Sequence, residues 1–550
     1  MKKLLLGAAL GALLSGQAFA APPIDGQRIA QDIKVLSSDA YEGRAPASAA
    51  EPKTLEYIIA GFKAAGLQPG GDPLKGGGRA WTQDVPLARF TTDGPVKVSV
   101  TGGGETKAWT QGEEIAIRAA QTGAARVIMK NTPIVFAGYG VKAPERNWDD
   151  FKGMDLKGKV VLVLVNDPDF ETGKGDFGGK AMTYYGRWTY KFEEAARQGA
   201  AGFLVIHERA PAAYGWATVK NSNTNEIFDI IRKDPSAAHA PLEGWIQRDA
   251  AVDILKKAGL DFDALKKQAQ TRDFRPVELK GVTFNADYAV KPQQVISHNV
   301  VGLLPGRTRP DEHVIYTAHW DHLGVGLPDA KGDAIYNGAL DNASGTAALM
   351  ELARVYAKAP RTARSVVFLS VTAEEKGLLG SEYYAANPLY PLATTVASLN
   401  MDGVSLIGKS KDITSSGDSP MTLQDDLIRV AKAHGYYFSP DPHPEAGSYY
   451  RSDHFPLAKR GVPAISFGGG EDFVNGGREA GKAASEAYIR DRYHQPADEF
   501  DPNWNFKATE DELALFYDLG HELADSTGWP SWKDGAEFKA ERDKTAAQRK

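Results

Sequence analysis

Two histidines and four carboxylates in the C-terminal half of the chain are of the residue types that bind metal ions. They are His319, Asp341, Glu374, Glu375, Asp402 and His494. Four bare carboxylates gathered in one place would repel one another, and several would have to stay protonated. Dications remove that difficulty, and a set of imidazole and carboxylate ligands suits zinc. These residues therefore predict a site for two Zn²⁺ ions, provided that the fold brings them together.

The charges of such a site predict separate roles for the two adjacent glutamates. Two Zn²⁺ ions are neutralised by Asp341, Glu375 and Asp402 together with one bound hydroxide. Neighbouring residues at the end of an extended strand point in opposite directions, so Glu375 can hold metal while Glu374 faces the bridging water. We expect Glu374 to act as the general base, which takes a proton from that water and delivers it to a leaving amine.

Two further side chains are expected to support the ligands and the reaction. Asp321 stands two residues after His319 and can accept a hydrogen bond from the imidazole nitrogen that does not bind metal, which selects the tautomer. Tyr493, next to His494, can donate its phenol proton to a developing oxyanion. Because zinc lowers the pKa of bound water toward ~7, hydroxide is available near neutral pH. The expected chemistry is hydrolysis by a hydroxide that bridges two metals.

The predicted elements would bring these side chains to one edge of a sheet. From residue 298 onward, β-branched runs alternate with helical patterns, which indicates an α/β fold with a mostly parallel sheet flanked by helices. In such sheets, ligands bind beyond the carboxyl ends of the strands. We expect strands at 313–317, 365–372, 395–399 and 463–467, and a helix at 344–358. His319, Glu374 and Asp402 each follow one of these strands.

The rest of the chain divides into further segments. Residues 21–96 form the first part of the main domain, largely helical over 29–67 and a strand near 81–87. Residues 97–289 contain short apolar strands near 134–136, 160–165 and 203–206 and helical patterns at 192–198 and 250–270, and we interpret them as an inserted β-rich module. Residues 290–530 complete the main domain, and residues 531–550 are a polar C-terminal tail.

Composition and the N-terminal segment restrict the class of protein. The chain has 550 residues and no cysteine. Its net charge of -6 argues against a nucleic-acid binder, because such proteins have a basic excess. Residues 1–20 combine a charged start, a short apolar run and a small-residue cleavage site at Ala18-Phe19-Ala20, as a signal peptide does. No later segment approaches the ~20 apolar residues that a membrane span needs. We therefore expect an exported protein, periplasmic or secreted.

A known family has the same series of residues. The chain resembles the bacterial co-catalytic di-zinc aminopeptidases, a family that also contains glutamate carboxypeptidases, at His319-Trp320-Asp321, Asp341-Asn342, Glu374-Glu375, Asp402 and Tyr493-His494. The resemblance covers roughly 29–87 and 298–523 and implies the zinc exopeptidase fold. It further implies that His319 and Asp402 hold one metal, that Glu375 and His494 hold the other, and that Asp341 bridges them. The family also has a cis peptide bond after the bridging aspartate.

The same resemblance extends to residues around the site. Residues 136–140 and 158–161 are similar to the protease-associated module that is often inserted in this family. Arg451 matches a pocket arginine of related aminopeptidases and is expected to contact substrate. His454 is expected to lie near the ligands without being one. His322 could support a ligand in the same way, but the favoured interpretation is a structural histidine. The passage 468–482 is expected to be a flexible loop beside the pocket. The aromatic residues of 184–190 are expected to form a core or an interdomain surface, with substrate contact as the less favoured alternative.

The overall resemblance favours an exopeptidase that acts on peptide or protein N-termini. An aminopeptidase needs acidic or carbonyl acceptors for a free ammonium group, whereas a carboxypeptidase needs Arg or Lys for a terminal carboxylate. Neither Arg451 nor Glu445 decides between them. A glutaminyl cyclase would work with a single zinc, and a receptor-like binding protein would have lost ligands, so the full ligand set argues against both. The oligomeric state stays open.

Overall fold

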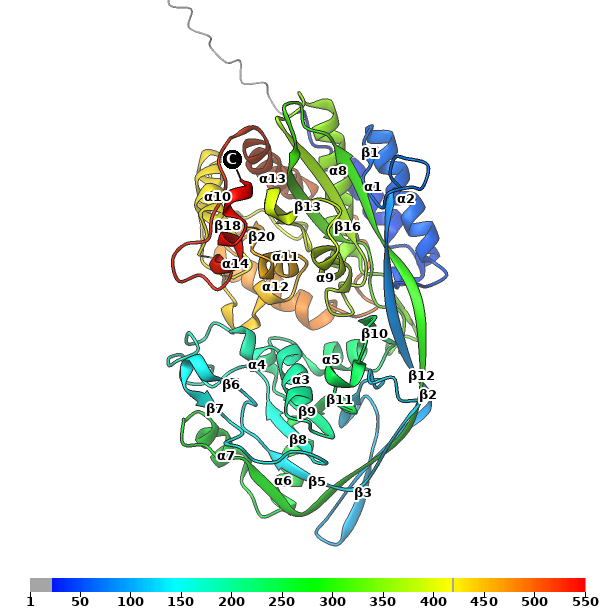
Figure 1. Ribbon diagram of the computed structural model, residues 1–550, viewed down its shortest axis with the longest axis vertical. Coiled ribbons are helices and arrows are strands. Elements are labelled where there is room, and N and C mark those ends of the chain that lie inside the picture. Colours follow the sequence, from blue (N-terminus) through cyan, green and yellow to red (C-terminus); the bar gives the residue numbers. More distant parts are fainter. Residues whose placement is uncertain (1–21, 418–419, 550) are drawn as a thin grey trace, which may run out of the picture.

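Two bodies joined by a pair of long strands make up the molecule (Figure 1). The computed structural model describes residues 22–417 and 420–549, so the predicted signal peptide lies outside the described residues. Strands β2 (Thr82–Gly102) and β12 (Val277–Leu304) pair antiparallel over most of their length and run from the upper body into the lower one. The expected module boundaries, at residues 97 and 289, therefore fall inside two continuous strands.

The upper body, here called the main domain, comprises the chain before β2 and after β12 and is built on a mixed sheet. Four strands lie side by side in parallel at its centre, in the order β20 (Ala464–Gly469), β17 (Thr395–Asn400), β13 (Arg309–His319) and β16 (Arg364–Val371). Strand β12 flanks β16 antiparallel, and β18 (Asp412–Ser415), with β19 (Tyr437–Phe438) beside it, flanks β20. Every residue of β16 is buried, as expected for a strand covered on both faces. The predicted mostly parallel α/β fold is confirmed.

Helices cover this sheet in two layers. One layer contains α1 (Gly26–Leu36), α2 (Glu51–Ala65), α8 (Gly345–Lys358), α10 (Thr422–Ala433) and α13 (Phe506–Asp525), which contact one another. The other contains α9 (Leu379–Ala386) and α11 (His454–Lys459), which pack together, and α11 contacts β17 and β20. Among the helices of the described ranges, none is long and apolar enough to cross a bilayer.

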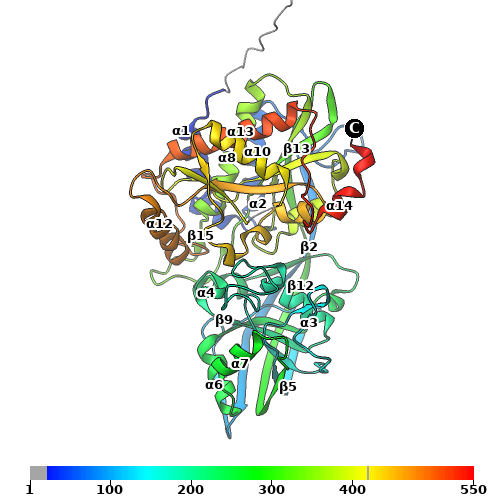
Figure 2. The same ribbon diagram turned by 90° about the vertical axis from the view of Figure 1, so that its left-hand side faces the viewer.

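The lower body, here called the inserted module, comprises residues 103–276 and the adjoining parts of β2 and β12 (Figure 2). Its sheet has four parallel strands, β5 (Arg126–Phe136), β8 (Val160–Leu164), β9 (Gly202–His207) and β11 (Leu242–Gln247), with β4 (Ile115–Ile117) antiparallel at the edge. Its helices include α3 (Trp188–Arg197), α5 (Trp216–Asn223), α6 (Arg248–Lys257) and α7 (Phe262–Ala269). The module is thus α/β rather than simply β-rich.

Two short regions differ from their sequence-based interpretation. The passage 468–482, expected to be a flexible loop, contains the end of β20 and the start of helix α12 (Gly477–Asp491). The alanines between 480 and 487 favour this helix. The segment expected to be a polar tail packs against the main domain in its described part. Trp532 and Phe538 are buried there, and Arg542 of α14 (Lys539–Asp543) donates to the carbonyl of Thr395 at 2.9 Å.

One buried arginine fastens the N-terminal segment to the strand ends. The Arg44 guanidinium is 1% exposed and donates to four carbonyl oxygens, those of Leu36 (2.8 Å), Asn337 (2.6 Å), Gly338 (2.7 Å) and Trp320 (2.9 Å). These carbonyls belong to the end of α1, the two residues just before the turn Ala339–Ser344, and the residue after β13. A single side chain therefore holds three segments that meet beneath the strand ends.

The residue before Arg44 allows this close approach. Gly43 has φ +65°, and a Cβ atom there would lie 2.5 Å from the carbonyl oxygen of Tyr336. Only glycine adopts this conformation readily and leaves room for the neighbouring backbone.

Replacement of Arg44 by alanine should destabilise the protein strongly. Four buried carbonyls would lose their donor, and each unsatisfied group costs about 1–3 kcal/mol, so we expect the free energy of unfolding to fall by at least about 3 kcal/mol. Denaturant unfolding measures this change. The control is Arg126→Ala, because Arg126 forms an exposed ion pair with Asp287 that contributes at most about 1 kcal/mol. Equal effects of the two substitutions would contradict this role of Arg44.

Candidate metal and catalytic site

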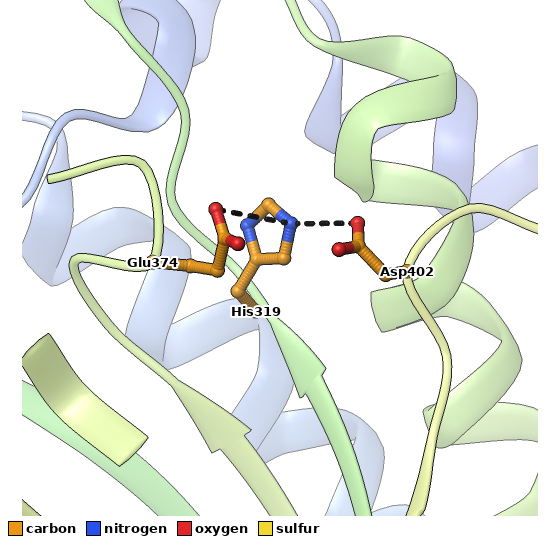
Figure 3. A group of neighbouring side chains, drawn as sticks. All are labelled: His319, Glu374 and Asp402. Carbon is orange, nitrogen blue, oxygen red and sulfur yellow. Dashed lines mark hydrogen bonds and ion pairs between the residues drawn. The ribbon is translucent and has the colours of Figure 1, made fainter. Parts of the chain in front are cut away.

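The predicted ligands and the predicted base converge at the carboxyl ends of three parallel strands. His319 is the last residue of β13, Glu374 and Glu375 follow β16, and Asp402 follows β17. Asp341 comes from the turn Ala339–Ser344 before α8, and His494 lies just beyond α12. Figure 3 shows the imidazole of His319 between the carboxylates of Glu374 and Asp402.

The distances divide these side chains into two histidine-centred groups. His319 Nε2 lies 3.1 Å from Asp402 Oδ1 and 3.4 Å from Asp341 Oδ1. His494 Nε2 lies 3.0 Å from Glu375 Oε2 and 3.2 Å from Asp341 Oδ2. Asp341 therefore presents one oxygen to each histidine. This pairing agrees with the ligand sets that the family resemblance implied, with Asp341 between them.

The chemistry of the donors fits divalent metal ions. His319, Glu374 and Asp402 offer ligand atoms within 4.8 Å of one another, and so do His322, Asp341 and Glu375. Both groups combine imidazole with carboxylate, and His319 is 1% exposed. Such donors, clustered at this spacing, suit zinc or a similar transition metal.

His322 takes part in the site more directly than its interpretation as a structural histidine suggested. The ring is fully buried, and Nδ1 lies 2.6 Å from Glu375 Oε1. Glu375 therefore lies between two histidines, with His494 beside its other oxygen. The position of His322, three residues after His319, was the only signal in the sequence that it contacts the site. The ring of His322 is perpendicular to that of His494, with centroids 5.7 Å apart.

Asp321 supports the site through different atoms than expected. The Nδ1 atom of His319 lies 3.1 Å from the Asp321 carbonyl oxygen, whereas the Asp321 carboxylate is 3.8 Å away. The carboxylate instead accepts hydrogen bonds from the backbone N–H groups of Glu374 (3.0 Å) and Glu375 (3.4 Å). The main chain of Asp321 thus orients the imidazole, and its side chain holds the two glutamates, because β13 and β16 are neighbours.

The turn that carries Asp341 is held by residues to which the sequence had assigned no role. The backbone N–H of Asp341 donates to the buried carboxylate of Asp498 at 3.0 Å. The Asn342 amide oxygen accepts from the backbone N–H of Gly345 and of Gly403, both at 2.9 Å. A Cβ at Gly345 would lie 2.3 Å from that oxygen, so this position requires glycine. The Asp341–Asn342 peptide is cis, as the resemblance implied.

Tyr493 and Arg451 form a pair beside the carboxylates. The Arg451 guanidinium donates from Nη2 to the Tyr493 phenol oxygen at 2.8 Å and lies over the ring of Tyr214, a residue of the inserted module. Burial raises the pKa of Tyr493, so the phenol keeps its proton. Since its oxygen already accepts from Arg451, its own O–H is available to a further acceptor.

Two cavities meet at these residues. The larger, about 960 Å³, is lined by Asp341, Glu374, Asp402 and Tyr493 and, from the module, by residues that include Phe170, Lys180 and Arg209. The smaller, about 200 Å³, also reaches Glu374 and is lined by residues that include Arg187, Ser222 and Lys376. Both bodies of the molecule therefore supply walls of the site.

His454 and the aromatic residues of 184–190 lie close to this site. His454 is fully buried, packs against Tyr449 with ring centroids 4.8 Å apart and belongs to neither ligand group, which agrees with its assignment as a neighbour. Of the aromatic residues of 184–190, Tyr184 contacts the rings of Tyr450 and Phe455 in the main domain. That part of the cluster is an interdomain surface, which is one of its predicted roles.

The close packing of like charges shifts the protonation of the site. Burial raises the pKa of Glu374 well above its ordinary value; His319 opposes this shift, and Asp402 and Glu375 add to it. Burial alone would lower the pKa of His494, but Glu375 and Asp341 outweigh it and raise the value to about 9. Without metal, protons therefore neutralise part of the negative charge.

Removal of metal should make the stability of the protein depend on pH between about 6.5 and 9. The folded pKa of His494 is above its ordinary 6.5, so its protonation stabilises the fold fully below about pH 6.5, and this contribution is lost as the pH rises through about 9. We expect the Tm of the chelated protein to fall over this interval. Chelated His494→Gln should show a shallower fall, and an equal slope in both proteins would contradict this assignment.

Comparison with known proteins agrees with this geometry. Residues 299–515 match the model described as Peptidase family M28. A probable zinc metalloprotease of Pyricularia oryzae is 37% identical over 138 residues, which are 24% of this chain and 25% of that protein. Aminopeptidase NAALADL1 of Mus musculus is 32% identical over 157 residues, 24% of this chain and 19% of that protein. The matches thus span a quarter or less of the length of these curated relatives.

A solved structure shares the fold over nearly the whole chain. The aminopeptidase from Aneurinibacillus sp. strain AM-1 superimposes with a TM-score of 0.54 at 20% identity, over 91% of this chain and 94% of that one. The matched segment 299–515 contains the five candidate ligands and the general-base candidate Glu374. The chain therefore carries a domain of peptidase family M28.

Proposed function

We propose that the protein is an exported metallo-aminopeptidase that holds two Zn²⁺ ions per chain and removes N-terminal residues from peptides. The observation that carries this proposal is the position of Asp341. Its two oxygens face different histidines, and each histidine has a second carboxylate beside it. One zinc would be held by His319 and Asp402 and the other by His494 and Glu375, with Asp341 shared. When bound, zinc polarises a substrate carbonyl and acidifies water.

Glu374 is placed to move the proton. Its side chain is 10% exposed, faces the larger cavity, and lies 4.0 Å from His319 Nε2, farther than Asp402 or Asp341. The carboxylate can accept a proton from the attacking water and donate it to the leaving amine. Its backbone N–H is held by Asp321, which keeps the carboxylate in place between the two transfers.

Tyr493 and Arg451 are placed to stabilise negative charge on the substrate. The phenol proton of Tyr493 can be donated to the oxyanion that develops on the scissile carbonyl. Arg451 polarises the phenol through the 2.8 Å hydrogen bond and orients it. These two residues and Glu374 line the same cavity, so the base and the oxyanion donor can act on one peptide bond.

A carboxypeptidase is the second candidate, and two cations in the smaller cavity favour it. Arg187 and Lys376 are each 7% exposed, and Arg187 Nε and Lys376 Nζ have no hydrogen-bond acceptor in the described part of the chain. Both line the same cavity as Arg451, where they could receive a terminal carboxylate. The names of the similar proteins favour the aminopeptidase. The complete ligand set argues against a single-zinc cyclase or a receptor-like protein.

Peptides with blocked ends separate the two candidates. We expect hydrolysis of peptides with a free amino end and a C-terminal amide, loss of hydrolysis with a chelator, and recovery with zinc. N-acetylated peptides should not be cleaved, because their N-terminus cannot carry the ammonium charge. Cleavage of N-acetylated peptides from a free carboxyl end would instead establish the carboxypeptidase.

Replacement of Glu374 by glutamine should remove catalysis and keep the metals. Loss of a general base lowers kcat by about 10²–10⁴-fold, while the five proposed ligand side chains are unchanged. Elemental analysis should find the same zinc content as in the wild type. Glu105→Gln, an exposed position on β3 (Glu105–Trp109), is the matched control and should keep full activity. Wild-type activity of Glu374→Gln would exclude this mechanism.

A further inference from the structure

The inserted module makes direct contact with one of the proposed metal ligands. Consecutive residues of α5 contact His494, which belongs to the main domain. The hydroxyl of Ser222 lies 2.9 Å from His494 Nδ1, and the Asn221 side-chain amide donates to the His494 carbonyl at 3.0 Å. The side chain and the main chain of His494 are therefore both held by a helix that is more than 270 residues away in the sequence.

The surroundings of His494 Nε2 indicate the role of the Ser222 contact at Nδ1. Nε2 faces Asp341 and Glu375, so it is the atom that would bind metal, and it must then be unprotonated. The neutral ring carries its proton on Nδ1 and donates it to the Ser222 hydroxyl oxygen. Such a contact on the outer nitrogen of a metal-binding histidine selects the tautomer and sets the ring orientation.

The two histidines are supported from different parts of the molecule. The equivalent nitrogen of His319 contacts the carbonyl of Asp321, only two residues away on the same strand end. His494 lies in a loop and has φ +55°, in the left-handed region that residues other than glycine seldom adopt. The main domain therefore orients His319 by itself, whereas the side chain of His494 is oriented by the module.

Further contacts, from residues before and after Ser222 in the sequence, hold the module against the main domain. The Asn225 side-chain amide donates to the Leu323 carbonyl at 3.1 Å, and that of Asn166 donates to the Glu445 carbonyl at 3.1 Å. The ring of Tyr184 packs against those of Tyr450 and Phe455. The position of α5 against His494 is thus part of a continuous interface.

We propose that Ser222 of the inserted module is a positioning residue for the metal ligand His494, so that docking of the module completes one of the two metal sites. This inference rests on the proposed function, because it takes His494 as a zinc ligand. The module then serves as more than a wall of the pocket. The site at His319 and Asp402 would bind metal without it, and the site at His494 and Glu375 would bind metal tightly only with it.

Titration of the metal-free full-length protein tests this proposal. Zn²⁺ is added to wild type and to Ser222→Ala in competition with a chelating dye, and the two dissociation constants are determined. We expect Ser222→Ala to weaken one site by about 10–100-fold, as loss of a histidine's outer partner does, and to leave the other site unchanged. Ser222→Thr, which keeps the hydroxyl, should restore the affinity.

A matched variant and two further outcomes complete the test. Thr224→Val removes a hydroxyl from the same segment that donates to the Lys220 carbonyl and, among the described residues, to no part of the metal site. This variant should bind both ions like the wild type. Two unchanged dissociation constants in Ser222→Ala would overturn the proposal while leaving the two-zinc function intact. Failure of the wild type to bind two ions would overturn the proposed function itself.

Discussion

The constraint on which the rest of this structure depends is the gathering of four carboxylates within a few ångströms of two buried histidines. Like charges at such distances oppose one another strongly in a low-dielectric interior, and the side chains would separate if the backbone allowed it. The backbone does not allow it. Asp321 holds the N–H groups of both glutamates, Asp498 holds that of Asp341, and Arg44 holds the segments beneath. The fold keeps these groups together, and the negative charge makes the site attract cations.

The candidate site residues differ in how firmly the backbone holds them. The carboxyl ends of parallel strands supply positions that vary little, because each strand is hydrogen-bonded to its neighbours. Two of the candidate ligands are not on strand ends: Asp341 comes from the turn before α8, and His494 comes from a loop and has a backbone conformation uncommon for histidine. The inserted module contacts His494 through α5. The two cavities, which have walls from both bodies, lie at the same junction.

Much of the site could be predicted because its chemistry is local in sequence. Strand-end positions follow from hydrophobic patterns, and the residue types after each strand indicate metal binding, so five ligands and a base could be named. Residues that act at a distance could not be found in this way. Nothing in the pattern around Asp498 or Ser222 shows that the first supports Asp341 and the second contacts His494. Helix α12 was missed because its glycine-rich start hid the alanine-rich pattern that follows.

The amino-acid sequence by itself determined the α/β order of elements, and it predicted the ligand types and separate roles for Glu374 and Glu375. These follow from hydrophobic periodicity and from the alternation of side chains along a strand, both of which operate between near neighbours. Only the tertiary structure decided that His322 contacts Glu375, that the Asp321 carboxylate holds the glutamates rather than the imidazole, and that the inserted module reaches His494. Each of these depends on the spacing between segments far apart in the chain, which packing sets and local patterns do not encode.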